Sequence, residues 1–180
     1  RCSNEVRHSV VITRPFWLGR YQVTQGQWQK VTGKDNPSCF KDDPNLPVET
    51  VSWYGIHKDF LPKLGKGFGL PTEAQWEYAC RAGTTTPFNL GENITPEQVN
   101  YNGNYPYTAG KKGDNRRNTV AVGRLKSPNA WGGHDFHGNV WEWCEDFCEW
   151  ENNVVTDTYV NDVIDPICHT GSTRVNRGGR

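Results

Sequence analysis

The stretch from Thr84 to Trp131 constrains the fold of this chain more than any other part of the sequence. It is rich in Asn, Gly, Pro, Thr and Tyr, it has no helical periodicity, and only Thr119–Leu125 is typical of a strand. A stretch of this length without regular structure is a binding loop, an ion-held loop or a disordered segment. Tyr101, Tyr105 and Tyr107 argue against disorder, because disordered segments contain few aromatic residues. The sequence therefore predicts an ordered region that is held in place by bound ions.

The length and the charge of the chain limit its class. With 180 residues and a formal net charge of zero, the chain has the size of one domain, and we expect a single domain over residues 1–180. No apolar run approaches the roughly 18 residues that span a bilayer, so a membrane-embedded protein is not expected. A neutral chain without a basic stripe lacks the charge on which nucleic-acid binding depends, so DNA and RNA are not expected as partners.

Capping signals predict short helices separated by loops. A Ser or Thr precedes each expected helix, and a Gln three residues after Thr24 and Thr72 completes a capping box. The third helix has the strongest signals, because Glu77 and Arg81 form an i,i+4 pair and Gly83 occupies the C′ position. Pro62 is unfavourable in the interior of the second helix. The expected helices cover residues 25–31, 53–64 and 73–81, and the expected strands are Ser9–Thr13 and Phe16–Val23.

The cysteines leave two interpretations open. An even number of cysteines, six, permits 15 full disulfide pairings in an oxidising compartment, whereas free Cys is among the most buried residue types. Cys80 favours burial, because it lies inside the third expected helix beside Ala79. Cys144, Cys148 and Cys168 suit a disulfide or a buried thiol equally well, and a metal site with His169 is a less favoured third interpretation.

Several motifs in this chain occur together in one known protein family. The motifs are Phe16–Trp28, Pro47–Trp53, Leu70–Gly83, Gly138–Trp143 and Arg174–Gly179. They closely resemble the formylglycine-generating, sulfatase-modifying family in order and in spacing, over nearly the whole chain. The resemblance implies an α+β, C-type-lectin-like fold of that family's own variety, with little regular secondary structure and two or three short helices.

The resemblance also implies two structural calcium ions. Calcium takes six to eight oxygen ligands from carboxylates, amides and backbone carbonyls, and an Asn- and Gly-rich loop can supply them. One implied site consists of Asn100, the carbonyl of Tyr101, Asp114 and the carbonyl of Arg116. The other consists of Asp135, the carbonyls of Gly138 and Val140, and the carboxylate of Glu142. The alternative interpretation is that Asp114 is a solvated turn residue and that Glu142 pairs with an Arg.

The enzymes of this family hold a copper ion with two cysteines that follow an Arg-Gly-Gly-Ser motif. Paired thiolates suit Cu(I). Here the sequence ends at Gly178, Gly179 and Arg180, so Arg replaces the Ser and the cysteine segment is not present. We therefore expect that this domain lacks its C-terminal segment and that the chain as given has no catalytic residues.

Two functional hypotheses follow from the resemblance. The first is a non-catalytic module that binds or displays a ligand, similar to the variable proteins of diversity-generating retroelements, with an unidentified protein or small molecule as its partner. The alternative is an oxidoreductase that converts a substrate cysteine to formylglycine, and only this alternative requires copper. The cysteine count and the calcium sites favour a secreted, periplasmic or cell-surface location over a cytoplasmic one.

Overall fold

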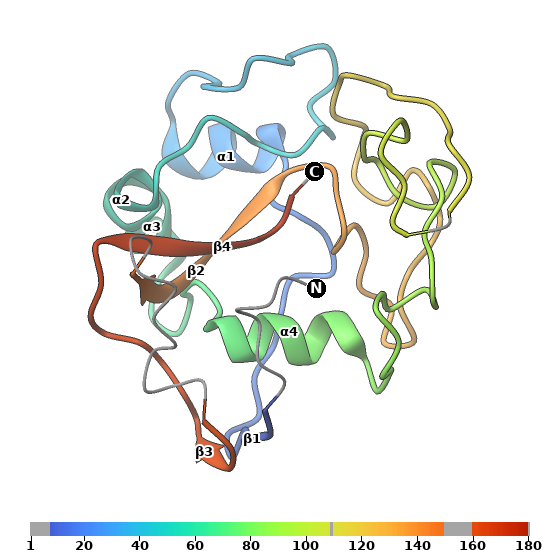
Figure 1. Cartoon of the computed structure of the whole chain (residues 1–180). Coiled ribbons are helices and arrows are strands. Elements are labelled where there is room, and N and C mark those ends of the chain that lie inside the picture. Colours follow the sequence, from blue (N-terminus) through green and yellow to red (C-terminus); the bar gives the residue numbers. More distant parts are fainter. Residues whose placement is uncertain (1–7, 109, 150–159, 180) are drawn as a thin grey trace.

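The computed structural model describes residues 8–108, 110–149 and 160–179. An antiparallel pair of strands, β2 (Trp141–Cys148) and β4 (Thr173–Gly178), crosses the middle of the molecule. Figure 1 shows short helices on one side of this pair, long loops without regular structure on the other, and α4 beneath it. The architecture confirms the expected α+β class with little regular secondary structure.

The first two helical segments begin where the capping signals placed them. α1 (Gln25–Thr32) has Thr24 as its N-cap, a complete capping box with Gln27, and a left-handed Gly33 (φ 66°) after its last residue. The second segment runs unbroken as α2 (Trp53–Gly55), the π-helical turn η1 (Ile56–Phe60) and α3 (Leu61–Leu64). The wide turn lies immediately before Pro62, whose missing N–H disturbs ordinary helical hydrogen bonding.

The third helix, α4 (Glu73–Arg81), has the predicted bounds, and Thr72 and Gln75 form its capping box. The left-handed backbone after the helix begins one residue earlier than expected. Ala82 (φ 45°) already has a positive φ, as does the predicted position, Gly83 (φ 89°). α4 packs against β2 and β4. The core formed there consists of Trp76, Cys80, Phe136 and Cys144, and the Cys144 side chain is completely buried.

The strand predictions were largely wrong. Of Ser9–Thr13, only β1 (Val10–Val11) is a strand, and it pairs in parallel with β3 (Val163–Ile164). Phe16–Val23 runs as an irregular segment, and Thr119–Leu125 ends in a turn. In the latter segment, the Val120 N–H donates to the side chain of Asn139 and not to a neighbouring strand. Local β propensity therefore did not decide the structure, because these segments form hydrogen bonds with the backbone and side chains of loops and not with neighbouring strands.

The long loop region is ordered in its described parts, 84–108 and 110–131. It has a small core of its own, in which Phe88 and Leu90 pack on the buried residues Ile94, Val99 and Tyr101. No helix in the described parts of the chain has the length and apolar character needed to cross a membrane.

Candidate functional site

Asn139 joins the long loop region to the start of β2. The backbone N–H of Asn139 donates to the carbonyl oxygen of Asn100 (2.9 Å). Its Oδ1 accepts hydrogen bonds from Val120 N–H (2.9 Å) and Asn100 Nδ2 (3.1 Å), and its Nδ2 donates to the Val120 carbonyl (3.0 Å). Asn139 is buried and has a positive φ of 69°. These bonds hold the two segments that carry the predicted cation ligands against each other.

The buried side-chain amide of Gln22 forms hydrogen bonds with oxygen atoms of one of the two predicted cation sites. Its Nε2 lies 3.3 Å from the carbonyl oxygen of Asp135, 3.2 Å from that of Gly138 and 2.8 Å from Glu142 Oε1. Glu142 Oε2 accepts a hydrogen bond from Trp76 Nε1 (2.9 Å). The other amide atom, Gln22 Oε1, is buried without a hydrogen-bond partner. Three of the four predicted residues of this site are thus brought together around one side chain.

The electrostatics of this site suit a cation. Burial, together with a smaller contribution from the nearby carboxylate of Asp135, raises the pKa of Glu142 to about 7. Burial also raises the pKa of Asp135, whose Oδ2 accepts one hydrogen bond from the Gly123 N–H (2.7 Å). The hydrogen bonds of the Glu142 carboxylate are with the neutral donors Gln22 and Trp76, which does not favour the alternative of an Arg partner. A bound divalent cation would compensate both buried carboxylates.

The donor set of this site fits calcium. Carboxylate, amide and carbonyl oxygens are the ligands that calcium takes. The oxygen and the nitrogen of a Gln amide are assigned from hydrogen bonding. A 180° flip of the Gln22 amide would place its unpartnered Oε1 beside the oxygens of Asp135, Gly138 and Glu142. The carbonyl of Val140, the fourth predicted ligand, instead accepts a hydrogen bond from the Gly179 N–H (3.2 Å).

The other predicted site is assembled less completely. Asn100 is buried, its Nδ2 donates to the Asn118 carbonyl (2.9 Å), and its Oδ1 is buried without a partner. A cation is one group that would satisfy this oxygen. Asp114 is exposed, and its carbonyl accepts from the Gly103 N–H (3.1 Å). Arg116 donates to the Pro96 carbonyl (2.6 Å).

The hydroxyl of Tyr101, whose carbonyl is the remaining predicted ligand, donates to the Ile94 carbonyl (3.1 Å). Within the described parts of the chain, the hydrogen bonds of Asp114 and Arg116 therefore do not join them to Asn100. Sequence reasoning also missed the participation of Gln22 and Trp76 in the first site. Both lie inside the motifs that carried the resemblance, but nothing local marks a Gln as buried.

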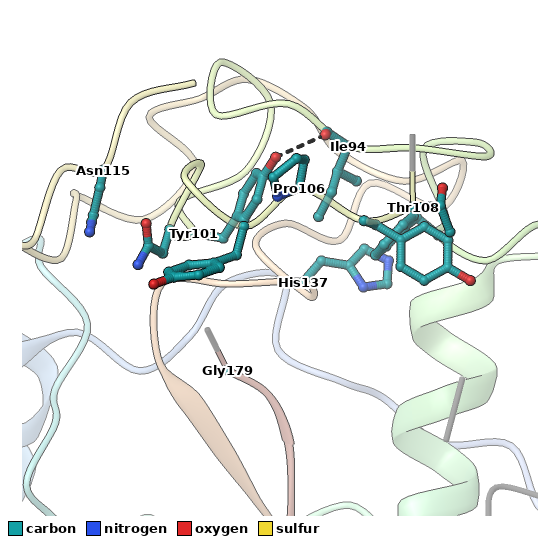
Figure 2. A pocket seen from close by; sticks show the side chains of 11 residues that line it. Ile94, Tyr101, Pro106, Thr108, Asn115, His137 and Gly179 are labelled. Atoms are coloured by element: carbon teal, nitrogen blue, oxygen red, sulfur yellow. Dashed lines mark hydrogen bonds between the residues drawn. The ribbon is translucent and has the colours of Figure 1, made fainter. Parts of the chain in front are cut away.

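A cavity of about 710 Å³ lies beside these sites, between the long loops and the end of β4. Figure 2 shows its side chains coming from several loop segments around Gly179, which follows β4. The cavity shares segments with the predicted cation ligands, since it is lined by Tyr101, by Asn115 between Asp114 and Arg116, and by His137 between Asp135 and Gly138. Its lining residues are Phe88, Ile94, Tyr101, Asn102, Tyr105, Pro106, Tyr107, Thr108, Asn115, His137 and Gly179. We call this cavity the aromatic pocket.

One wall of the aromatic pocket is fixed by ring contacts. Phe88 makes edge-to-face contacts with Tyr107 and with His137, each with ring centroids 5.1 Å apart. The Nε2 of His137 accepts a hydrogen bond from the Asn89 N–H (3.1 Å), and burial lowers the pKa of His137 to about 4. The hydroxyl of Tyr101 is engaged with Ile94 (Figure 2). His137 is therefore a packed neutral residue of the wall.

The described cysteines are all free thiols, namely Cys39, Cys80, Cys144, Cys148 and Cys168; Cys2 lies outside the described residues. Burial raises the pKa of the Cys80 and Cys144 thiols, so neither is a ready thiolate. Within the described parts of the chain, no three His, Cys, Asp or Glu side chains form a metal-binding group, which argues against the less favoured metal site at Cys144, Cys148 and Cys168. Arg180, which replaces the Ser of the motif, also lies outside the described residues.

The raised pKa of Glu142 predicts a pH dependence of stability in calcium-free protein. The folded protein keeps the proton between the ordinary pKa of 4.5 and about 7, where the unfolded chain has lost it. The stabilisation from this group is therefore present below pH 4.5 and is lost as the pH rises to about 7. This shift in the pKa of Glu142 corresponds to a change of roughly 3 kcal/mol in the free energy of unfolding, at about 1.4 kcal/mol per pKa unit.

The measurement is urea unfolding of the wild type and of Glu142→Gln in calcium-free buffer between pH 4.5 and 8. We expect the wild-type free energy of unfolding, relative to that of the variant, to fall across this range. The subtraction removes the opposite contribution of His137, whose lowered pKa makes stability rise with pH. A difference that does not change with pH would show that Glu142 is ionised in the folded protein.

Comparisons with known proteins agree over most of the chain. A family model for the sulfatase-modifying factor enzyme 1-like domain matches residues 3–180. The chaperone protein LppX of Paenibacillus barcinonensis is 32% identical over 189 residues, which cover 78% of this chain and 64% of that protein. The formylglycine-generating enzyme of Thermomonospora curvata is 32% identical over 182 residues, which cover 97% of this chain and 55% of that protein.

Among solved structures, Treponema denticola variable protein 1 is similar with a TM-score of 0.67 and 26% sequence identity. The match covers 89% of this chain and 71% of that chain. The chain thus spans between half and two thirds of the length of the two curated relatives.

Proposed function

This chain belongs to the sulfatase-modifying factor enzyme 1-like family and has that family's C-type-lectin-like fold, and from this premise we propose that it is a non-catalytic module that binds a ligand in the aromatic pocket. The observation that carries the proposal is the pocket itself. It is a concave site of about 710 Å³ with aromatic, amide and hydroxyl side chains, and no thiol is among the lining residues that the structure describes. Such a composition suits binding of a small molecule or of a segment of a protein.

The structural similarity to a variable protein supports the binding function over a catalytic one. A scaffold whose loops are held by buried amides can present a pocket without itself changing shape. The partner is then a small molecule or a protein met outside the cytoplasm, in a secreted, periplasmic or cell-surface setting.

Calcium is part of this proposal as a structural ion. The residues that would hold it are Glu142, Asp135, the carbonyl of Gly138 and the turned amide of Gln22, and the unpartnered oxygen of Asn100 marks the second site. When bound, the ions would fix the segments that carry Tyr101, Asn115 and His137. The cation sites would thereby hold the walls of the aromatic pocket in place.

The alternative function is the conversion of a substrate cysteine to formylglycine, which the likeness to the formylglycine-generating enzyme of Thermomonospora curvata favours. Copper in that reaction needs a pair of accessible thiolates. The described thiols do not supply such a pair at the pocket, because Cys80 and Cys144 are buried with raised thiol pKa values and none of the described lining residues is a cysteine. We therefore derive no catalytic step for this chain.

The binding proposal is tested by NMR on the isotopically labelled chain. We expect uncharged fragments from a small-molecule library to shift the backbone amide signals of Tyr105, Tyr107 and Thr108, which line the pocket. Signals of the exposed Tyr54, on α2, serve as the internal control. Fragments that shift no pocket signal, or that shift signals over the whole surface, would contradict a ligand site in the pocket.

The catalytic alternative is tested with the same chain, Cu(I), oxygen and a peptide that carries a sulfatase-type substrate cysteine. We expect no peptide aldehyde, as measured by mass spectrometry after labelling with an aminooxy reagent. Formation of aldehyde above the copper-only control would overturn the non-catalytic proposal.

A further inference from the structure

We propose that the aromatic pocket selects a neutral carbohydrate, with one apolar sugar face on the ring of Tyr105 and with sugar oxygens that accept hydrogen bonds from Asn102 and Asn115. This inference rests on the proposed binding function and names the chemical class of its ligand. It is carried by three features of the pocket lining, which are its lack of charge, its free aromatic ring and its fixed amide donors.

The described lining of the pocket carries no acidic or strongly basic side chain. Among residues 8–108, 110–149 and 160–179, none of those that line the pocket is Lys, Arg, Asp or Glu. His137 accepts a hydrogen bond from the Asn89 N–H on Nε2 (3.1 Å), so this nitrogen is engaged within the wall. A charged ligand would lose its hydration in this pocket without gaining an opposite charge, whereas a neutral ligand has no such loss.

Tyr105 offers an aromatic face that nothing in the described structure covers. Its side chain is 80% exposed, although most large hydrophobic side chains of the loop region are packed. The other rings of the pocket are already engaged, since Phe88 contacts Tyr107 and His137 edge to face. A large exposed ring at the edge of a concave site is available for stacking against an apolar ligand face.

Two amide groups of the pocket are held as hydrogen-bond donors. The Oδ1 of Asn102 accepts from the Asn104 N–H (3.2 Å), and the Oδ1 of Asn115 accepts from the Arg117 N–H (3.0 Å). These bonds fix which end of each amide is the oxygen, and they leave both Nδ2 groups without a partner among residues 8–108, 110–149 and 160–179. Figure 2 shows Asn115 extending from its loop on the side of the pocket where Tyr101 lies.

A sugar matches these features better than a peptide does. Each sugar hydroxyl can accept a hydrogen bond from an amide donor and can rotate to donate to Tyr or Thr hydroxyl oxygens. A peptide backbone presents one N–H donor for each non-proline residue as well as a carbonyl acceptor. Next to the NH₂ groups of Asn102 and Asn115, these N–H donors would find no acceptor. The C–H face of a sugar ring also supplies the apolar surface that Tyr105 requires.

The test is binding of cellotriose, maltotriose and N,N′,N″-triacetylchitotriose to the full chain, measured by saturation-transfer NMR and by calorimetry. We expect at least one of these neutral sugars to bind, and trigalacturonate to bind at least about tenfold more weakly because of its carboxylates. Tyr105→Ala should weaken binding roughly three- to tenfold. Asn115→Asp keeps the acceptor for the Arg117 N–H but removes the NH₂ donor, and it should weaken binding by a similar factor.

The control variant is Tyr54→Ala, which removes a 73% exposed tyrosine on α2 and should leave sugar affinity unchanged. Binding that Tyr105→Ala and Asn115→Asp leave intact would overturn the inference, as would tighter binding of trigalacturonate. If all three neutral sugars fail while uncharged fragments or a capped neutral peptide bind at the pocket, the carbohydrate inference is wrong and the proposed binding function stands. If nothing binds there, both are wrong.

Discussion

Millimolar calcium should raise the thermal unfolding midpoint of chelator-treated protein by several degrees. A ligand that binds only the folded state at about 100 times its dissociation constant adds about 2.7 kcal/mol of stability. For a domain of this size, about 1 kcal/mol corresponds to roughly 2–4 °C. The physical source is the site around Gln22, where the buried carboxylates of Glu142 and Asp135 face neutral donors in the cation-free protein.

The matched variants are Glu142→Gln and Glu92→Gln, measured by calorimetry with and without calcium. Glu142→Gln removes the buried carboxylate and should lose the part of the calcium shift that this site contributes, whereas Glu92 is exposed and its variant should respond as the wild type does. The shift should also be larger at pH 8 than at pH 5.5, because calcium needs an ionised Glu142 and its pKa is about 7. Equal midpoints with calcium and with chelator would refute both cation sites.

Gly138→Ala should destabilise the protein by about 1–3 kcal/mol, the usual cost of forcing extra volume into packed structure. A Cβ at this position would lie 2.5 Å from the carbonyl oxygen of Asn100 and 2.9 Å from Val99 Cγ1. The first contact is with backbone, so a side-chain rotation cannot relieve it. The two segments would have to separate, which would also weaken the bonds between Asn139 and Asn100.

The control is Gly69→Ala, because a Cβ there meets nothing within 4 Å and its φ is not in the left-handed region. We expect denaturant unfolding to show a lower midpoint for Gly138→Ala and little change for Gly69→Ala. Since the Gly138 carbonyl is a predicted ligand of one cation site and its Cα faces Asn100 of the other, its variant should also respond less to calcium. A Gly138→Ala protein as stable as the wild type would mean that the two segments are not in close contact.

The helices could be read from the sequence because their signals are local. A capping box needs a Thr and a Gln three residues apart, and both boxes formed as predicted at Thr24 and Thr72. The segment 53–64 was helical as expected, and the conflict introduced by Pro62 was resolved by a π-helical turn. That a wider turn would relieve the conflict could not be read from residue spacing.

The central strands could not be found in the same way. β2 and β4 are 24 residues apart, between Cys148 and Thr173, and their pairing contains a register shift between Trp143 and Phe147. In this pairing Arg174 lies against the rings of Trp53 and Phe147, with its guanidinium carbon 3.7 Å and 3.3 Å from their centroids. Contacts of this kind join distant parts of the chain, and no local sequence pattern predicts them.

The sequence by itself determined the family, the capped helices and which segments supply candidate oxygen ligands, because these depend on residue types at short, fixed spacings. Only the tertiary structure decided that the Gln22 amide stands among the oxygens of Asp135, Gly138 and Glu142, and that separate loop segments together line the aromatic pocket. The reason is that burial and hydrogen-bond partnership are properties of how distant segments meet. A Gln or an Asn carries the same local signal whether water or a buried carboxylate is its neighbour.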